Sequence, residues 1–152
     1  MTAVPAALRA IQAAFTARLP AGTLITVGPG VTDDAALSGQ VFIGCSDPDE
    51  KTYAEAVIGS QQWAFLGHTT RDETFTVHCS AVAWNGDTNA LAAVDGVYAL
   101  MGAIEAAIVA DPTLGGALLY AVGITSHSLR FVVSQSGISA IVPFDFECRT
   151  RI

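Results

Sequence analysis

Basic residues are scarce in this chain of 152 residues. Seven lysines and arginines stand against fourteen acidic residues, which gives a formal net charge of −7. A protein that binds nucleic acid along its phosphates needs a basic surface that displaces counterions, so the composition excludes a general nucleic-acid binder. Charged residues make up only 14% of the chain and hydrophobic residues 51%. This balance also excludes an intrinsically disordered chain.

Cysteine is scarce too, and its spacing forms no motif. Cys45, Cys79 and Cys148 are odd in number, lie far apart and include no CxxC pair. They exclude a disulfide scaffold and favour a reducing compartment. The first residues show no basic leader before an apolar segment, which predicts no signal peptide. The uncharged run 112–129 contains Pro112 and several glycines, so it predicts a turn and a strand rather than a membrane span.

The residues that could carry chemistry are scattered along the sequence. The three histidines share no spacing typical of zinc ligands. Gly28-Pro29-Gly30 lacks the rest of a phosphate-binding motif and predicts a turn. His78 and Cys79 are neighbours on a predicted strand, where adjacent side chains point to opposite faces, so the imidazole could not activate the thiol. We therefore expect no enzymatic activity, no cofactor and no metal.

Hydrophobic periodicity divides the chain into two helices and seven strands. The clearest strand covers residues 71–84, where apolar and polar residues alternate. The longest helix, at 88–110, carries only Asp95 and Glu105 as charged residues. We expect such a helix to be covered on more than one side, by its own sheet and by something else. The expected elements are helices at 3–18 and 88–110 and strands at 24–27, 40–45, 61–66, 71–84, 117–125, 128–134 and 138–149.

The order of these elements lacks the regular alternation of a parallel α/β fold. It predicts one α+β domain over residues 1–152, with a mostly antiparallel (mixed) sheet and both helices packed on one face. The gaps between the last three strands have the size of turns, which predicts that these strands form an antiparallel meander. The polar stretch from Ser46 to Gly59 predicts a loop or β-hairpin excursion.

A distinctive segment follows the long helix. Asp111-Pro112 ends that helix, because the residue before a proline disfavours the α conformation. Gly115 and Gly116 permit the positive φ that returns the chain to the sheet. The segment from Glu105 to Gly116 reads E-x-x-I-x-x-DPTLGG. Together with the closing strand at 140–149 and the layout of the whole chain, it resembles the tail terminator (tail-completion) proteins of phages with long, non-contractile tails, particularly phages of actinobacterial hosts.

The resemblance implies a structural virion protein that forms a ring, typically a hexamer, on the head-proximal end of the phage tail. Such a ring stops addition of the tail tube protein and presents a surface that joins a head–tail connector or neck protein. DNA would pass through the lumen without specific binding. The protein would assemble in the host cytoplasm and would have no membrane partner.

The acidic residues between positions 33 and 50 suggest one feature of such a ring. If they face the lumen, their negative charge would repel DNA and let it slide. The simpler interpretation is that they are solvated loop carboxylates that keep an apolar protein in solution. The candidate lumen residues are Asp33, Asp34, Asp47, Asp49 and Glu50.

Two alternatives stay open at the level of sequence. The chain could be another neck or connector-completion protein that docks on the head side only. It could instead be a small-molecule-binding or catalytic domain with a pocket near Trp63, Trp84 and Tyr98, because aromatic residues line many ligand sites.

Overall fold

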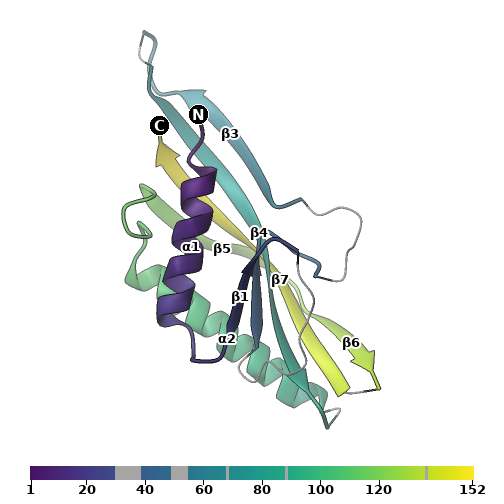
Figure 1. Ribbon diagram of the computed structural model, residues 1–152. Coiled ribbons are helices and arrows are strands. Elements are labelled where there is room, and N and C mark those ends of the chain that lie inside the picture. Colours follow the sequence, from purple (N-terminus) through teal and green to yellow (C-terminus); the bar gives the residue numbers. More distant parts are fainter. Residues whose placement is uncertain (30–38, 49–54, 68, 88, 136) are drawn as a thin grey trace.

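Two helices cover one face of a seven-stranded mixed sheet (Figure 1), which confirms the α+β prediction. The computed structural model describes residues 1–29, 39–48, 55–67, 69–87, 89–135 and 137–152. The elements in chain order are α1 Val4–Arg18, β1 Leu24–Val27, β2 Gln40–Ile43, β3 Val57–Trp63, β4 Arg71–Asn85, α2 Ala90–Ala110, β5 Tyr120–His127, β6 Arg130–Ser134 and β7 Gly137–Arg151.

The two longest strands, β4 and β7, form the centre of the sheet. They pair in antiparallel register from Asp72 opposite Arg151 to Asn85 opposite Ile138. Each has 15 residues and is therefore about 50 Å long at roughly 3.3 Å per residue. This length leaves room for two short strands, end to end, on each outer edge. Strands β3 and β2 line β4, strands β5 and β6 line β7, and β1 adds to β2 in parallel.

The predicted meander of the last three strands is wrong. Among the described residues, β5 and β6 each pair with β7 and not with each other. The chain therefore continues along the edge of β7 and does not reverse between β5 and β6. The break lies beside Pro143, whose carbonyl accepts a hydrogen bond from Ser128 N–H at 3.1 Å. Proline has no N–H to donate, so the ladder is interrupted at this point of β7.

Strand β3 begins and ends earlier than the predicted strand at 61–66. It covers Val57–Trp63, so part of the predicted Ser46–Gly59 excursion belongs to a β-hairpin with β4. Residues 49–54 of that excursion lie outside the described residues. Almost every residue of β3 is exposed. Because neither face of β3 is consistently buried, its sequence lacks the alternation from which a strand is predicted.

The main hydrophobic core lies between the sheet and the two helices. Its largest fully buried side chains include Phe15 of α1, Phe75 of β4, Ile104 of α2, and Phe144 and Phe146 of β7. A smaller buried cluster lies on the opposite face of the sheet. Its members are Phe42, Cys45, Val82 and Ile141. The sheet is therefore partly covered on both faces.

Helix α2 is long and apolar and packs mainly against β4 and β7. It starts after Asn89, whose side-chain oxygen accepts a hydrogen bond from Ala92 N–H at 3.2 Å. In length and composition α2 would suffice for a membrane span, a criterion that the core helix of a soluble protein meets equally. Seven of its 21 residues are buried within the chain. The rest of its circumference lies outside the core.

Candidate functional site

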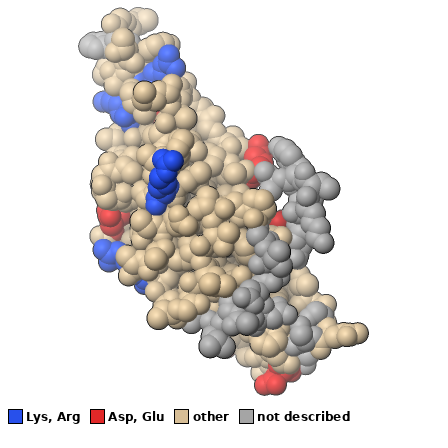
Figure 2. Space-filling model, viewed as in Figure 1, with Lys and Arg blue, Asp and Glu red and all other residues tan. Residues whose placement is uncertain are grey.

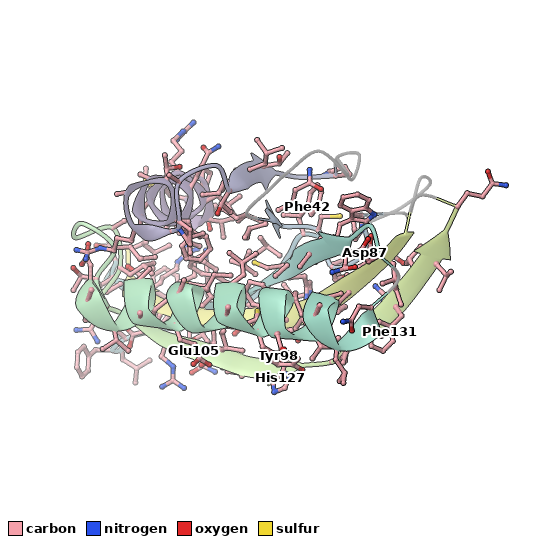
Figure 3. The ribbon with its side chains drawn as sticks, turned by 90° about the horizontal axis from the view of Figure 1, so that it is seen from below. Phe42, Asp87, Tyr98, Glu105, His127 and Phe131 are labelled. Carbon is pink, nitrogen blue, oxygen red and sulfur yellow. The ribbon has the colours of Figure 1, made fainter. Side chains whose placement is uncertain are left out.

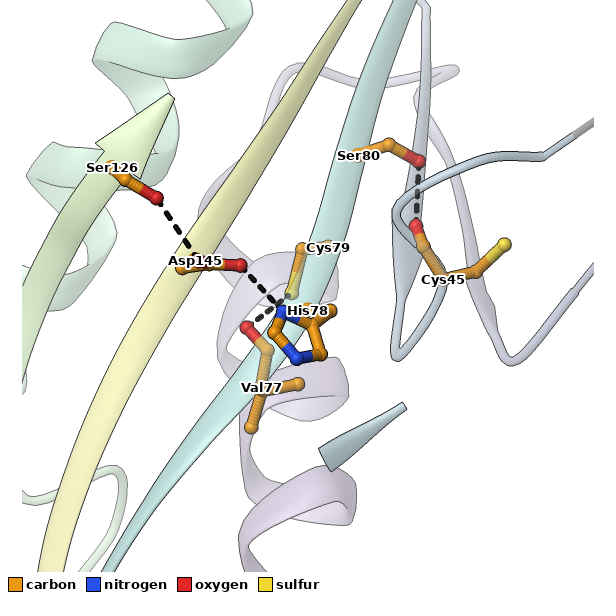
Figure 4. A network of polar contacts seen from close by, with 7 residues as sticks. All are labelled: Cys45, Val77, His78, Cys79, Ser80, Ser126 and Asp145. Carbon is orange, nitrogen blue, oxygen red and sulfur yellow. Dashed lines mark hydrogen bonds and ion pairs between the residues drawn. The ribbon is translucent and has the colours of Figure 1, made fainter. Parts of the chain in front are cut away.

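A polar network crosses three strands on the sheet face opposite the helices (Figure 4). His78 of β4 and Asp145 of β7 are direct cross-strand partners. The distance between His78 Nδ1 and Asp145 Oδ1 is 2.6 Å, and Ser126 Oγ of β5 donates to Asp145 Oδ2 at 3.0 Å. The His78 side chain is largely shielded and that of Asp145 is about one-third exposed. The network joins three neighbouring strands near the middle of the sheet.

The order of these three groups is not that of a hydrolytic triad. A triad needs the imidazole between the hydroxyl and the carboxylate, because the imidazole must take the hydroxyl proton. Here the carboxylate lies in the middle, and the Ser126 hydroxyl donates to Asp145 and not to His78. This arrangement positions strands and activates no nucleophile. The network was not predicted from the sequence, because it depends on the register of β4 against β7.

The predicted separation of His78 and Cys79 is confirmed. Cys79 lies on the helix-facing side of β4 within the main core and is 1% exposed. Burial raises the pKa of its thiol to about 12. Cys148 is buried as well, and its pKa is also raised to about 12 by burial. Burial likewise raises the pKa of Cys45. The three thiols therefore stay protonated and poorly nucleophilic at neutral pH.

The candidate lumen residues fall mostly outside the part of the chain that the structure describes. Asp33, Asp34, Asp49 and Glu50 belong to this group. Asp47 lies within the described residues, and its Oδ2 is 3.4 Å from Nη1 of Arg130 on β6. Since Arg130 offsets its charge, Asp47 contributes less negative potential than an isolated carboxylate would. Within the described ranges, no group of three or more His, Cys, Asp or Glu residues could hold a metal ion.

The helix-to-strand turn begins at Asp111, directly after the last residue of α2. The Asp111 carboxylate accepts hydrogen bonds from Gly115 N–H at 2.7 Å and from the Thr113 hydroxyl at 3.1 Å. Gly115 and Gly116 have φ values of +70° and +84°. Leu114 also has a positive φ of 49° and is buried, which was not predicted from the sequence. Pro112 directly follows the residue that ends α2, so Asp111, Gly115 and Gly116 act together in returning the chain from the helix.

The three aromatic residues proposed as a pocket do not meet. Trp63 lies opposite Arg71 at one end of β4, and Trp84 lies near the other end, about 40 Å away at roughly 3.3 Å per residue. Tyr98 lies on α2 and makes an edge-to-face contact with His127, with ring centroids 6.0 Å apart (Figure 3). The suggested pocket is therefore wrong, because a 15-residue strand separates its two tryptophans.

A shallow hollow of about 340 Å³ does occur where α1 ends and the chain enters β1. No charged side chain is among the described residues that line it. Without convergent polar groups the hollow lacks what fixes the orientation of a ligand. Its lining comprises Phe15, Thr16, Leu19, Pro20, Ala21, Gly22, Thr23, Leu24 and Ile25.

A group of exposed apolar side chains lies at the end of the β3–β4 hairpin, which projects beyond the helices (Figure 1). Trp63 is 60% exposed and Phe65 65% exposed, and Leu66 is fully exposed. The guanidinium carbon of Arg71 lies 4.3 Å from the centre of the Trp63 ring. Grouped apolar side chains of this size on a projecting hairpin are typical of an interaction surface.

The outer side of α2 is a second uncovered surface. Leu91 is 74% exposed and Val109 79% exposed, and Gly102 lies between them with nothing within 4 Å of the place where a Cβ would stand. Beyond the sheet, α1 also contacts α2, but the side that carries Leu91 and Val109 stays uncovered within the described part of the chain. The face of the molecule seen in Figure 2, which has the same view as Figure 1, is largely uncharged, with separated basic and acidic side chains.

The chain matches no protein-family model and no curated protein. Its functional assignment therefore depends on its own surfaces and on the resemblance of its motifs.

Proposed function

We propose that this chain is a structural virion protein whose copies form a closed ring at the head-proximal end of a phage tail. In this role the ring ends polymerisation of the tail tube protein and provides the surface for head joining. The single observation that carries the proposal is the uncovered outer side of α2, where Leu91 and Val109 are exposed. A helix with so few charges gains stability when a neighbouring subunit covers it.

The architecture is compatible with a rigid subunit. The sheet is held by the long antiparallel pairing of β4 with β7 and by the network of His78, Asp145 and Ser126. Those groups lie on the face opposite α1 and α2. The outer surfaces of the helices are therefore available for contacts between subunits, and the projecting hairpin is available for a second partner such as the tube.

The lumen hypothesis belongs to this proposal. Four acidic residues, Asp33, Asp34, Asp49 and Glu50, would supply most of the negative charge, since Arg130 offsets Asp47. Neutralising all five to the corresponding amides is expected to leave the ring intact and to make it retain DNA. The measurement is co-sedimentation of linear double-stranded DNA with the ring at low salt, where electrostatic repulsion is least screened. Equal retention by both proteins would refute the lumen role.

The ring itself is tested by light scattering and negative-stain microscopy of the purified chain. We expect a discrete species several times the 15.7 kDa subunit mass, with round, hollow particles. A second measurement tests whether the ring ends polymerisation of the tail tube protein. Added to polymerising tail tube protein from the same virus, the ring is expected to limit tube length. A chain that remains monomeric at every concentration, or tubes of unchanged length, would contradict the proposal.

A further inference from the structure

The two helices carry charges of opposite sign. Arg9 and Arg18 are the only charged residues of α1, and Asp95 and Glu105 are the only charged residues of α2. All four are exposed. Among the residues that the structure describes, none of the four has a hydrogen-bond or ion-pair partner. The exposed charges of α1 are therefore all basic and those of α2 all acidic. Arg9 and Arg18 lie nine residues apart, which places them on opposite sides of α1 at about 100° per residue, with Arg18 in line with the buried Ala7 and Ile11.

Three other described arginines form ion pairs within the chain. Arg151 lies 2.6 Å from Asp72, Arg149 lies 3.1 Å from Glu147, and Arg130 pairs with Asp47. The helix charges have not been paired in the same way, although α1 and α2 lie side by side. Figure 3 shows that Glu105 lies on the side of α2 that is turned away from α1.

The exposed surfaces around these charges consist mainly of small residues, which let two helix axes approach closely. On the side of α1 that carries Arg9, the exposed residues are Pro5, Ala6, Arg9, Ala13, Thr16 and Ala17. On α2 they are Leu91, Asp95, Gly96, Tyr98, Ala99, Gly102, Glu105, Ala106, Val109 and Ala110. We call the first set the α1 face and the second set the α2 face.

We infer that the α1 face of one copy packs on the α2 face of the next copy, with Arg9 directed at Asp95 and Glu105. The inference rests on the proposed ring and names its subunit interface. Arg9 is the only charged residue of the α1 face, and Asp95 and Glu105, about 15 Å apart along α2 at roughly 1.5 Å per residue, are the only charged residues of the α2 face. The charges of the two faces are therefore opposite in sign.

The distribution of charge also selects how the copies are related. An α1–α1 contact would bring arginines together, and an α2–α2 contact would bring carboxylates together, so both are disfavoured. An α1–α2 contact uses two different surfaces of the subunit. Such a heterologous contact leaves one α1 face and one α2 face free at the ends of every open assembly. It repeats until the ring closes.

Cross-linking tests the contact directly. The three native cysteines are buried, so an introduced exposed cysteine is expected to be the main reactive thiol. Ala13→Cys marks the α1 face and Gly102→Cys the α2 face. With a short bismaleimide reagent, a mixture of the two single variants should yield a cross-linked dimer, and each variant alone should yield little. A chain that carries both substitutions should yield a ladder extending beyond the dimer.

Several outcomes would overturn the interface. Dimers formed by either single variant alone would show a like-with-like contact. A ladder of the double variant that stops at the dimer would show a closed twofold pair. No cross-link in the mixture, although the wild-type chain forms rings, would place the ring interface elsewhere and leave the proposed function standing. A wild-type chain that stays monomeric would remove both the interface and the ring.

Charge reversal provides a second test with a built-in rescue. Arg9→Glu and Glu105→Arg, made singly, are each expected to weaken assembly about tenfold or more, measured by light scattering over a dilution series. The double variant restores opposite signs across the interface and is expected to recover most of the wild-type assembly. Circular dichroism spectra should stay unchanged, which confirms folding. Single variants that assemble like the wild type would overturn the inference.

Discussion

His78 and Asp145 face each other across β4 and β7, with His78 Nδ1 2.6 Å from Asp145 Oδ1. The carboxylate of Asp145 also accepts a hydrogen bond from the hydroxyl of Ser126 on β5. One acidic side chain thus links three adjacent strands on the face opposite the helices. Removal of Asp145 leaves both partners without this acceptor, whereas removal of Ser126 leaves the link between His78 and Asp145 in place.

Asp145→Ala is therefore expected to lower the free energy of unfolding by about 1–3 kcal/mol, the usual range for losing hydrogen bonds to a charged group. Ser126→Ala, the matched control, should cost less, about 0.5–1.5 kcal/mol, because only one bond is lost. The measurement is urea unfolding at pH 7, with equal denaturant slopes as a check. Equal costs for the two variants would show that the His78 bond contributes no stability.

Glu73 predicts a dependence of stability on pH. Burial acts to raise the pKa of this carboxyl, but hydrogen bonds from the Thr2 hydroxyl, Ala3 N–H and the Gln61 amide outweigh it, and the pKa is lowered. A lowered pKa means that the folded chain favours the carboxylate. The resulting stability is complete above the ordinary glutamate pKa, about 4.3. It is lost as the pH falls through the lower pKa of the folded state.

We therefore expect Glu73→Ala to lower the free energy of unfolding at pH 7 by about 1–3 kcal/mol. The difference from the wild-type chain should shrink as the pH is lowered below about 4. Urea unfolding at a series of pH values measures it, and Glu55→Ala, at an exposed position, is the control. A difference that stays constant from pH 7 to pH 3 would contradict the assignment of these hydrogen bonds to the charged form.

The burial of the cysteines predicts how fast their thiols react in the folded chain. Cys45, Cys79 and Cys148 are all buried, and burial raises the pKa of each thiol. In a native sample at pH 8, a disulfide reagent that releases a coloured thiolate should therefore react slowly. In guanidinium chloride all three thiols should react quickly, because the thiolate is the reactive form and becomes accessible. Rapid reaction of a native thiol would show that the core opens near that residue.

Substitution by alanine at two glycines is expected to change the stability of the fold in opposite directions. Gly102 lies inside α2 with nothing within 4 Å of an added Cβ, so Gly102→Ala should stabilise the fold by about 0.5–1 kcal/mol. Gly137 opens β7 at a φ of +145°, and a Cβ there would lie 2.9 Å from Gly86 Cα. Gly137→Ala should destabilise the fold by about 1–3 kcal/mol. Thermal unfolding monitored by circular dichroism measures both changes, and changes of the same sign would contradict this expectation.

The sequence by itself determined the elements whose periodicity is strong. The alternation of Thr74 to Ala83 predicted β4, and the apolar stripe of α2 predicted its extent to Ala110. In both cases one side of the element is buried. Apolar residues therefore recur at the regular spacing of a strand or a helix, and this spacing can be recognised in the sequence. The α+β class and the turn at Asp111 follow from the same local information.

Only the tertiary structure decided which strands are neighbours. The placement of β5 and β6 along one edge of β7, the early start of β3 and the separation of Trp63 from Trp84 all depend on pairing between distant segments. The same holds for Asp145, whose partner His78 lies 67 residues away. Local periodicity reports which face of a strand is buried, but it carries no information about the strand alongside. That choice is made when the whole core packs.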